Sequence, residues 1–158
     1  MKSTITCQCR STCRSKRCAC VNEGKACVNN DCGCSQCENP FNTIENPESL
    51  TDCARDHIKK VTLLSEKILA KKYNLPCDCE RATLKALLYD DACCHKCGCG
   101  FYYSFCADAV LDDHDMWHCF DCGTCREDSE WHCEYCNKCT YGLSLKCENC
   151  GRKSLYIL

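Results

Sequence analysis

The chain has 158 residues, of which 25 are cysteine, and its formal net charge is −2. This length leaves room for one ordinary domain or for two or three very small ones. Cysteine at this density indicates either a secreted disulfide framework or a set of metal sites. No stretch of the sequence is long and apolar enough to span a bilayer, so we expect no membrane partner.

The cysteine pattern favours metal sites over disulfides. The chain begins Met1-Lys2-Ser3-Thr4 and shows no charged-then-apolar signal sequence. Most cysteines lie in C-x-C or C-x2-C pairs, which present two thiolates to one tetrahedral zinc ion but do not easily bridge to each other. We therefore expect Zn²⁺, a reducing compartment and no secretion.

Nine cysteines dominate the first predicted element, residues 5–40. They are Cys7, Cys9, Cys13, Cys18, Cys20, Cys27, Cys32, Cys34 and Cys37. Three tetrahedral zinc ions need twelve bonds, so nine thiolates suffice if three of them bridge two ions each. Three separate sites would need twelve ligands, and two sites would leave one cysteine over. The spacing therefore predicts one three-zinc, nine-cysteine cluster, in which the chain turns at Gly24.

This cysteine pattern resembles the tesmin-type CXC domain. The likeness includes both C-x-C pairs, Gly24 in the connecting loop and the closing residues 34–39, CSQCEN. The resemblance implies an irregular backbone wrapped on three zinc ions and binding to the DNA minor groove. Tesmin members carry two such repeats and insert a tyrosine before the second C-x-C pair, whereas this chain has one repeat and Arg17 there. Arginine is attracted to narrow A·T-rich minor grooves, so we expect Arg17 to enter the groove.

Basic side chains accompany the predicted cluster. The candidate DNA contacts are Arg10, Arg14, Lys16, Arg17 and Lys25. Three Zn²⁺ and nine thiolates sum to −3, which nearly cancels the +4 from the side chains of residues 1–37. These side chains could therefore serve only to neutralise the cluster. Four of them lie within eight residues and are long enough to reach outward, so we expect a modest, salt-sensitive affinity for A·T-rich double-stranded DNA.

Residues 41–91 are predicted to form a helical linker segment. Ser49 or Thr51 can cap a helix that runs to about Tyr73, and Asp78 can cap a second one. The first helix has an apolar stripe of Ile58, Val61, Leu64 and Ile68, and its lysine-rich faces are either solvated or bound to nucleic acid. The candidate ligands Cys53, His57, Cys77 and Cys79 would join the two helices. The alternative is a buried cysteine beside a surface histidine.

A fourteen-residue repeat organises residues 92–152. The run Trp117-His118-Cys119 recurs as Trp131-His132-Cys133, and residues 145–150 form a truncated third copy. So short a repeat cannot bury a core alone, so metal must join successive turns. We predict a spiral of short strands and zinc knuckles, with Trp117, Trp131 and Leu145 stacked along one side.

The same region resembles the CTCHY zinc finger, a module found in certain ubiquitin ligases. The likeness rests on residues 101–103 (FYY), on residues 112–113 (DD) and on the cysteine–histidine run 117–139. The family has a C-x2-C pair where this chain offers only Cys106, and Cys94 with Cys97 or Cys99 are candidates for the missing ligands. The candidate ligands here are Cys94, Cys97, Cys106, His118, Cys119, Cys122, Cys125, His132, Cys133, Cys136, Cys139, Cys147 and Cys150. Among them, Cys136, Cys139, Cys147 and Cys150 make the simplest four-thiolate site.

These features favour a small zinc-rich protein that acts as a non-enzymatic DNA-binding adaptor in the nucleus or another reducing, DNA-containing compartment. We expect about seven zinc ions, three of them in the N-terminal cluster. Residues 90–139 carry eleven acidic residues against three basic ones, so we expect a protein partner there. Two alternatives stay open, a ubiquitin-ligase-associated zinc scaffold without DNA binding and a structural zinc protein of a virion or large assembly. Catalysis is not expected, because structural zinc sites are closed by four protein ligands.

Overall fold

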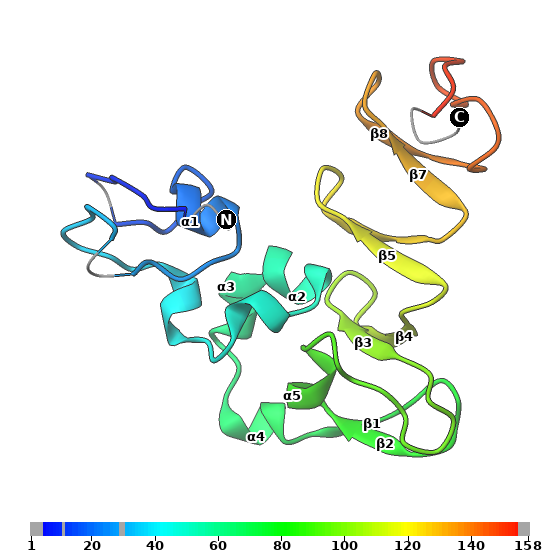
Figure 1. Cartoon of the computed structure of the whole chain (residues 1–158). Helices are drawn as coiled ribbons and strands as arrows, with labels where there is room; N and C mark the ends of the chain where they lie inside the picture. Colours follow the sequence, from blue (N-terminus) through cyan, green and yellow to red (C-terminus); the bar gives the residue numbers. More distant parts are fainter. Residues whose placement is uncertain (1–4, 11, 29–30, 155–158) are drawn as a thin grey trace.

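The computed structural model describes residues 5–10, 12–28 and 31–154. Residues 1–4, where we expect no signal sequence, lie outside this described part. Along the chain, Figure 1 shows loops at the N-terminal end, then short helices, then a series of hairpins that leads to the C-terminus. No helix in the described residues is long and apolar enough to cross a membrane.

Loops and turns make up most of the described backbone before Asn39. The helix α1 (Ala19–Asn22) is one turn long and begins after Cys18. The chain reverses at Gly24, whose φ of +64° lies in the left-handed region that favours glycine. The side chains buried here are mostly cysteines, among them Cys7, Cys13 and Cys20. This region therefore depends on its thiols for a core.

The middle of the chain consists of short elements. They are η1 (Pro40–Thr43), η2 (Pro47–Ser49), α2 (Asp52–Asp56), α3 (Ile58–Val61), α4 (Glu66–Leu69), β1 (Lys72–Asn74), β2 (Arg81–Thr83) and α5 (Leu84–Leu87). Thr51 caps α2, and its Oγ1 accepts a hydrogen bond from Ala54 N–H at 3.2 Å. The helix expected to run to about Tyr73 is divided among α2, α3 and α4, because Ser65 caps a new helix after Thr62 has ended α3. Serine and threonine hydroxyls bond to nearby backbone groups and so favour helix ends.

The second predicted helix also begins later than expected. Tyr73 lies in β1, which pairs antiparallel with β2 and leaves Cys77 and Cys79 in the connecting turn. Asp78 has a φ of +55° within that turn and caps no helix. Thr83 Oγ1 caps α5 instead, accepting a hydrogen bond from Ala86 N–H.

The main hydrophobic core lies between the middle helices and the first hairpin of the C-terminal half. It includes Phe41, Leu50, Ile58, Val61, Leu75, Leu84, Leu87, Leu88, Phe101 and Tyr103. Of the predicted apolar stripe, Ile58 and Val61 are buried but Ile68 is 44% exposed. The segment expected to be a linker therefore supplies much of the core.

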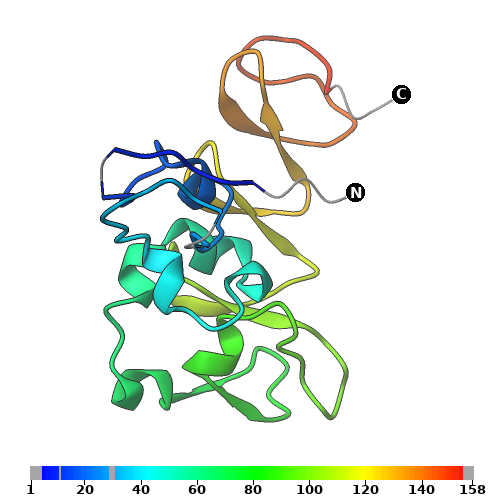
Figure 2. The ribbon, with the colours of Figure 1, turned by 60° about the vertical axis from the view of Figure 1, so that its left-hand side comes forward.

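Three antiparallel hairpins follow one another in the C-terminal half. They are β3 (Phe101–Ser104) with β4 (Ala109–Asp112), β5 (Met116–Cys119) with β6 (Thr124–Glu127), and β7 (Glu130–Cys133) with β8 (Lys138–Tyr141). Figure 2 shows the last of them, β7–β8 (orange), extending away from the helices. Trp117 Nε1 donates to Glu127 O at 2.9 Å, and Trp131 Nε1 donates to Gly142 O at 3.0 Å. Trp131 packs with Cys133 and Cys147 in a small cluster that, among the described residues, includes neither Trp117 nor Leu145, and Leu145 is 55% exposed.

Candidate metal centres

The thiols gather in groups without forming disulfides. All 25 cysteines lie in the described part of the chain, and none of them forms a disulfide there. Neighbouring Sγ atoms within the groups are 3.4 to 4.0 Å apart. A disulfide would need about 2.05 Å, whereas two thiolates on one tetrahedral zinc ion lie about 3.8 Å apart at a Zn–S distance of about 2.3 Å. The spacing fits metal ligation.

The nine N-terminal cysteines share members among their groups. The Sγ atoms of each of three sets lie within 4.8 Å of one another: Cys7, Cys9, Cys13 and Cys18; Cys7, Cys20, Cys27 and Cys32; and Cys7, Cys13, Cys27 and Cys34. The thiol of Cys37 interacts with those of Cys27 and Cys34. Cys7, Cys13 and Cys27 therefore recur, and the other six fall into pairs. Three bridging and six terminal thiolates give this arrangement around three tetrahedral ions.

Amide groups support the thiolates of this cluster. Asn39 Nδ2 donates to Cys27 Sγ at 3.2 Å, and Asn42 Nδ2 donates to Cys37 Sγ at 3.4 Å. Burial acts to raise the pKa of Cys18, but hydrogen bonds from the Val21 backbone and from neighbouring thiols lower that pKa to about 7. Charge-assisted hydrogen bonds of this kind favour the ionised, metal-binding form of a thiol.

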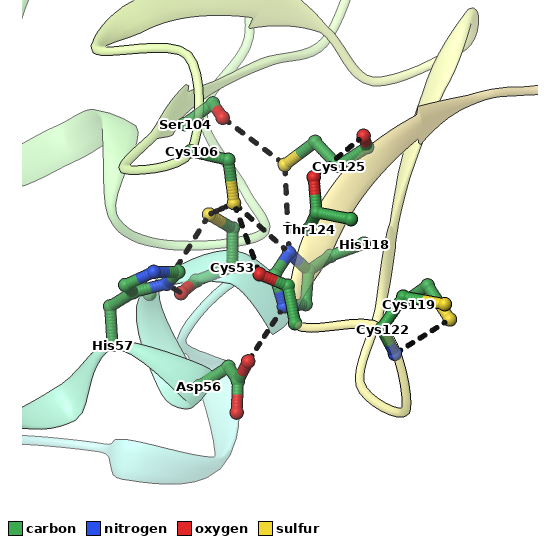
Figure 3. Close-up of polar contacts among 12 residues, drawn as sticks. Cys53, Asp56, His57, Ser104, Cys106, His118, Cys119, Cys122, Thr124 and Cys125 are labelled. Atoms are coloured by element: carbon green, nitrogen blue, oxygen red, sulfur yellow. Dashed lines mark hydrogen bonds and ion pairs between the residues drawn. The ribbon is translucent and has the colours of Figure 1, made fainter. Parts of the chain in front are cut away.

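A mixed site joins the middle helices to the hairpins. Ligand atoms of Cys53, Cys106, His118 and Cys125 lie within 4.8 Å of one another, and Figure 3 shows them converging from α2, the β3–β4 turn and β5–β6. His118 Nδ1 is 3.7 Å from Cys106 Sγ and 3.6 Å from Cys125 Sγ. His118 and Cys125 are cross-strand partners, so the hairpin register places both ligands on one face.

The grouping of Cys53 and His57 with Cys77 and Cys79 is wrong. Cys77 and Cys79 lie with Cys94 and Cys97 in a separate four-thiol group. His57 Nδ1 donates to the Cys53 carbonyl oxygen at 2.9 Å, and its ring stacks on Phe105. The reason is the β1–β2 hairpin, which carries the Cys77 turn away from α2 and toward residues 93–100.

Asp56 connects the mixed site to the N-terminal cluster. Its Oδ2 lies 3.0 Å from His118 Nε2, and its Oδ1 lies 2.9 Å from Lys16 Nζ. Burial acts to raise the pKa of Asp56, but the hydrogen bonds from Lys16 and His118 lower it. A carboxylate on the outer nitrogen of a ligating histidine fixes its tautomer and orientation. Sequence reasoning missed Asp56, although its position one turn after Cys53 is a usable signal.

The last two groups take ligands from successive hairpins. His132 Nδ1 lies 3.4 Å from both Cys119 Sγ and Cys122 Sγ, and Cys139 Sγ lies 3.4 Å from Cys122 Sγ. Cys133 Sγ is 3.5 Å from Cys150 Sγ, and Cys136 Sγ is 3.5 Å from Cys147 Sγ. The simplest site expected from sequence is thus corrected: Cys133 takes the place of Cys139, because Cys139 faces back toward Cys122 across from His132.

Two cysteines remain outside these groups. Cys93 and Cys99 are both exposed, and Cys93 pairs with Gly100 in an isolated antiparallel bridge. Cys99 lies at the rim of the Cys77 group, where the thiols of Cys97 and Cys77 raise its pKa. Cys99 is thus a neighbour of the four-thiol site and not one of its four closest ligands.

The basic side chains of the N-terminal region differ in what they contact. Arg14 pairs with Glu38, and Lys16 pairs with Asp56. Arg10, Arg17 and Lys25 are exposed and form no salt bridge with any described residue. A groove of about 360 Å³ is lined by Arg14 and Lys16 together with Arg55, Lys59 and Lys60 of α2 and α3. Lys59 and Lys60 of α3 therefore share one groove with Arg14 and Lys16 of the N-terminal region.

The chain matches no protein-family model, no curated protein and no solved structure. Its geometry establishes a small cysteine-rich protein with short helices, small sheets and several ligand groups that can hold metal ions.

Proposed function

We propose that this chain is a zinc-dependent, non-enzymatic DNA-binding adaptor. The observation that carries the proposal is the arrangement of the nine N-terminal thiols, with three shared and six terminal positions. Thiolate-rich tetrahedral groups select Zn²⁺ among the common divalent ions, and four protein ligands close a structural site. Four further groups in the described residues bring the proposed total to seven ions. The resemblance of the first cluster to the tesmin-type CXC domain supports the same proposal.

DNA would bind on the basic face of the N-terminal cluster. Arg17 is exposed and carries no ion pair with a described residue, so it is available for insertion into an A·T-rich minor groove. Arg10 and Lys25 are exposed and available for phosphates, and Lys59 and Lys60 lie in the groove that Arg14 and Lys16 also line. Arg14 and Lys16 would contribute less, because Glu38 and Asp56 already neutralise them. The acidic hairpins would repel DNA and meet a protein partner.

A gel-shift titration on A·T-rich duplex tests the DNA-binding half. Arg17→Ala is expected to weaken binding about tenfold, because one groove contact contributes on the order of 1–3 kcal/mol. Lys85→Ala, an exposed basic residue in α5, is the matched control and is expected to leave affinity unchanged. Equal binding by Arg17→Ala and Lys85→Ala would overturn the groove-insertion model.

Native mass spectrometry tests the zinc half. The expected mass increase corresponds to about seven Zn²⁺, at four ligands for each closed site with three shared thiolates. A count of about four or fewer would contradict the bridged cluster and the hairpin sites together.

A further inference from the structure

An aromatic cavity lies where α2, the residues after α5 and the first two hairpins of the C-terminal half meet. Its volume is about 230 Å³, and its aromatic lining is Tyr89, Phe101, Tyr102 and Trp117. Asp52, Asp90 and Asp113 also line it. Cys53 and His118 of the mixed metal site form part of its wall, so the metal group supports the cavity without filling it.

The polar ends of two lining aromatic side chains are already bonded. Tyr89 Oη donates to Glu45 O at 2.9 Å, and Trp117 Nε1 donates to Glu127 O at 2.9 Å. These two side chains therefore offer their rings to the cavity. The Asp90 and Asp113 carboxylates form no salt bridge with any residue in the described ranges. Aromatic rings beside two unpaired carboxylates favour a cation with an apolar surface.

A second, acidic groove is continuous with this cavity through Asp90 and Asp113. Its volume is about 630 Å³, and its lining includes Asp91, Asp112, Asp115 and His114. Gly100 lines this groove, and a Cβ there would collide with the Asp113 carboxylate. Because Gly100 has no side chain, the Asp113 carboxylate can lie where it lines both the cavity and the groove.

We propose that this cavity binds the ammonium end of a methylated lysine, and that the acidic groove holds the flanking basic residues of the same peptide. Ring quadrupoles attract an alkylated ammonium ion, which is cheaper to desolvate than a bare one. A hydrated divalent cation would instead need a shell of oxygen ligands. A choline headgroup carries the same ammonium chemistry, but its phosphate would meet the aspartates of the groove. The inference rests on the partner-binding half of the proposed function.

Tryptophan fluorescence tests this proposal, because Trp117 lines the cavity and the chain has two tryptophans. Trp131→Phe leaves Trp117 as the sole reporter in the full, zinc-loaded chain. The probes are one arginine-flanked peptide in three forms, with trimethyl-lysine, lysine or uncharged norleucine at its centre. The trimethyl-lysine form is expected to bind about tenfold more tightly than the norleucine form. Equal affinities of these two forms would overturn the proposal.

Charge-neutral variants locate the site. Asp113→Asn and Asp90→Asn, each made in the Trp131→Phe background, are expected to weaken the trimethyl-lysine peptide several-fold. Asp128→Asn, an exposed aspartate outside both spaces, is the matched control. Zinc counts and circular dichroism identical to the parent would show that the variants are folded. Unchanged affinity in both folded cavity variants would overturn the assignment.

Vesicles of phosphatidylcholine distinguish the source of the ammonium group. No change in Trp117 fluorescence is expected with vesicles, and a saturable change would overturn the peptide assignment. The fluorescence assay contains no DNA, so a negative result for peptide binding would not affect the gel-shift test of DNA binding.

Discussion

The carboxylate of Asp56 lies 3.0 Å from His118 Nε2, on the side of the ring opposite to the thiols of Cys106 and Cys125. Its other oxygen accepts a hydrogen bond from Lys16 of the N-terminal cluster. One side chain therefore orients a ligand of the mixed site and anchors the cluster beside α2. Two groups of candidate metal ligands that are distant in sequence therefore contact the same carboxylate.

Removing this carboxylate is expected to weaken metal binding at the mixed site. Asp56→Ala should lower the zinc affinity of the Cys53–Cys106–His118–Cys125 group about 10- to 100-fold, the usual effect of losing an outer-shell partner. Asp56→Asn should have a zinc affinity between those of the parent protein and Asp56→Ala, because its amide oxygen can still accept a hydrogen bond from His118 Nε2. Competition with a chromophoric chelator measures the change. Asp52→Asn, on the same helix without contact to His118, is the control, and equal affinity in Asp56→Ala and Asp52→Asn would refute the role.

Shared and terminal thiols should differ in how many ions they hold. Cys7→Ser is expected to release at least two of the three ions of the N-terminal cluster, because Cys7 is one of the three shared thiols and a bridging thiolate binds two ions. Cys9→Ser removes a terminal ligand and should release one ion or none. Native mass spectrometry of both variants gives the counts. Equal losses from the two variants would contradict a bridged cluster.

Alkylation of the zinc-loaded protein should modify two cysteines. Cys93 and Cys99 lie outside the ligand groups and are exposed, so both should react. Cys97, Cys106 and Cys150 are also exposed but should be protected by metal. Peptide mapping after iodoacetamide treatment identifies the sites. Early labelling of Cys106 or Cys150 would show that their groups hold no ion.

Cation binding in the aromatic cavity should weaken on acidification. Burial is the main cause of the raised pKa of Asp90; Asp52, Asp91 and Asp113 raise it further, whereas Arg55 lowers it. Asp90 therefore takes up a proton at a higher pH than an ordinary aspartate, and the protonated carboxyl no longer attracts an ammonium ion. Peptide affinity should be highest above this pKa and should fall as the pH decreases through it. In a pH titration, Asp90→Asn should lack this decrease in peptide affinity. An unchanged decrease would show that another group is responsible for it.

Alanine at Gly24 should destabilise the protein more than alanine at Gly98. Both glycines have positive φ, at +64° and +76°, so each substitution costs about 1–2 kcal/mol of backbone strain. At Gly24 the new Cβ would also collide with Arg55, whose guanidinium donates to Glu48 O and Leu50 O. Gly98 has no atom within 4 Å of such a Cβ. Thermal melting of the two variants measures the difference, and equal melting temperatures would show that Arg55 moves without cost.

Local features of the candidate sites could be predicted from the sequence. The fourteen-residue repeat places His118 and His132 at equivalent positions, and in the structure both point Nδ1 at thiols. The nine-cysteine spacing indicates shared ligands because the number of thiolates limits the number of bonds. Both signals lie within one short segment or one repeat.

Long-range pairing could not be predicted. Cys53 meets Cys106 at a sequence separation of 53, and nothing in either flanking sequence marks the other as its partner. The continuous apolar stripe of residues 58–68 also predicts one helix, whereas the Ser65 cap divides it. Ile68 belongs to the apolar stripe but is exposed, so the spacing of apolar residues identifies one face of a helix but not whether another element packs against it.

The last two ligand groups each combine residues from successive segments of the chain, and this arrangement affects the order in which metal ions can bind. Cys119 at the end of β5 and Cys122 in the following turn form half of one candidate site, which His132 and Cys139 of the next hairpin complete. Each pair of ligands therefore cannot complete a four-ligand site until the next hairpin has been translated. Ions should be captured in order along the chain, and an insertion or deletion between these hairpins should be tolerated only in whole fourteen-residue steps.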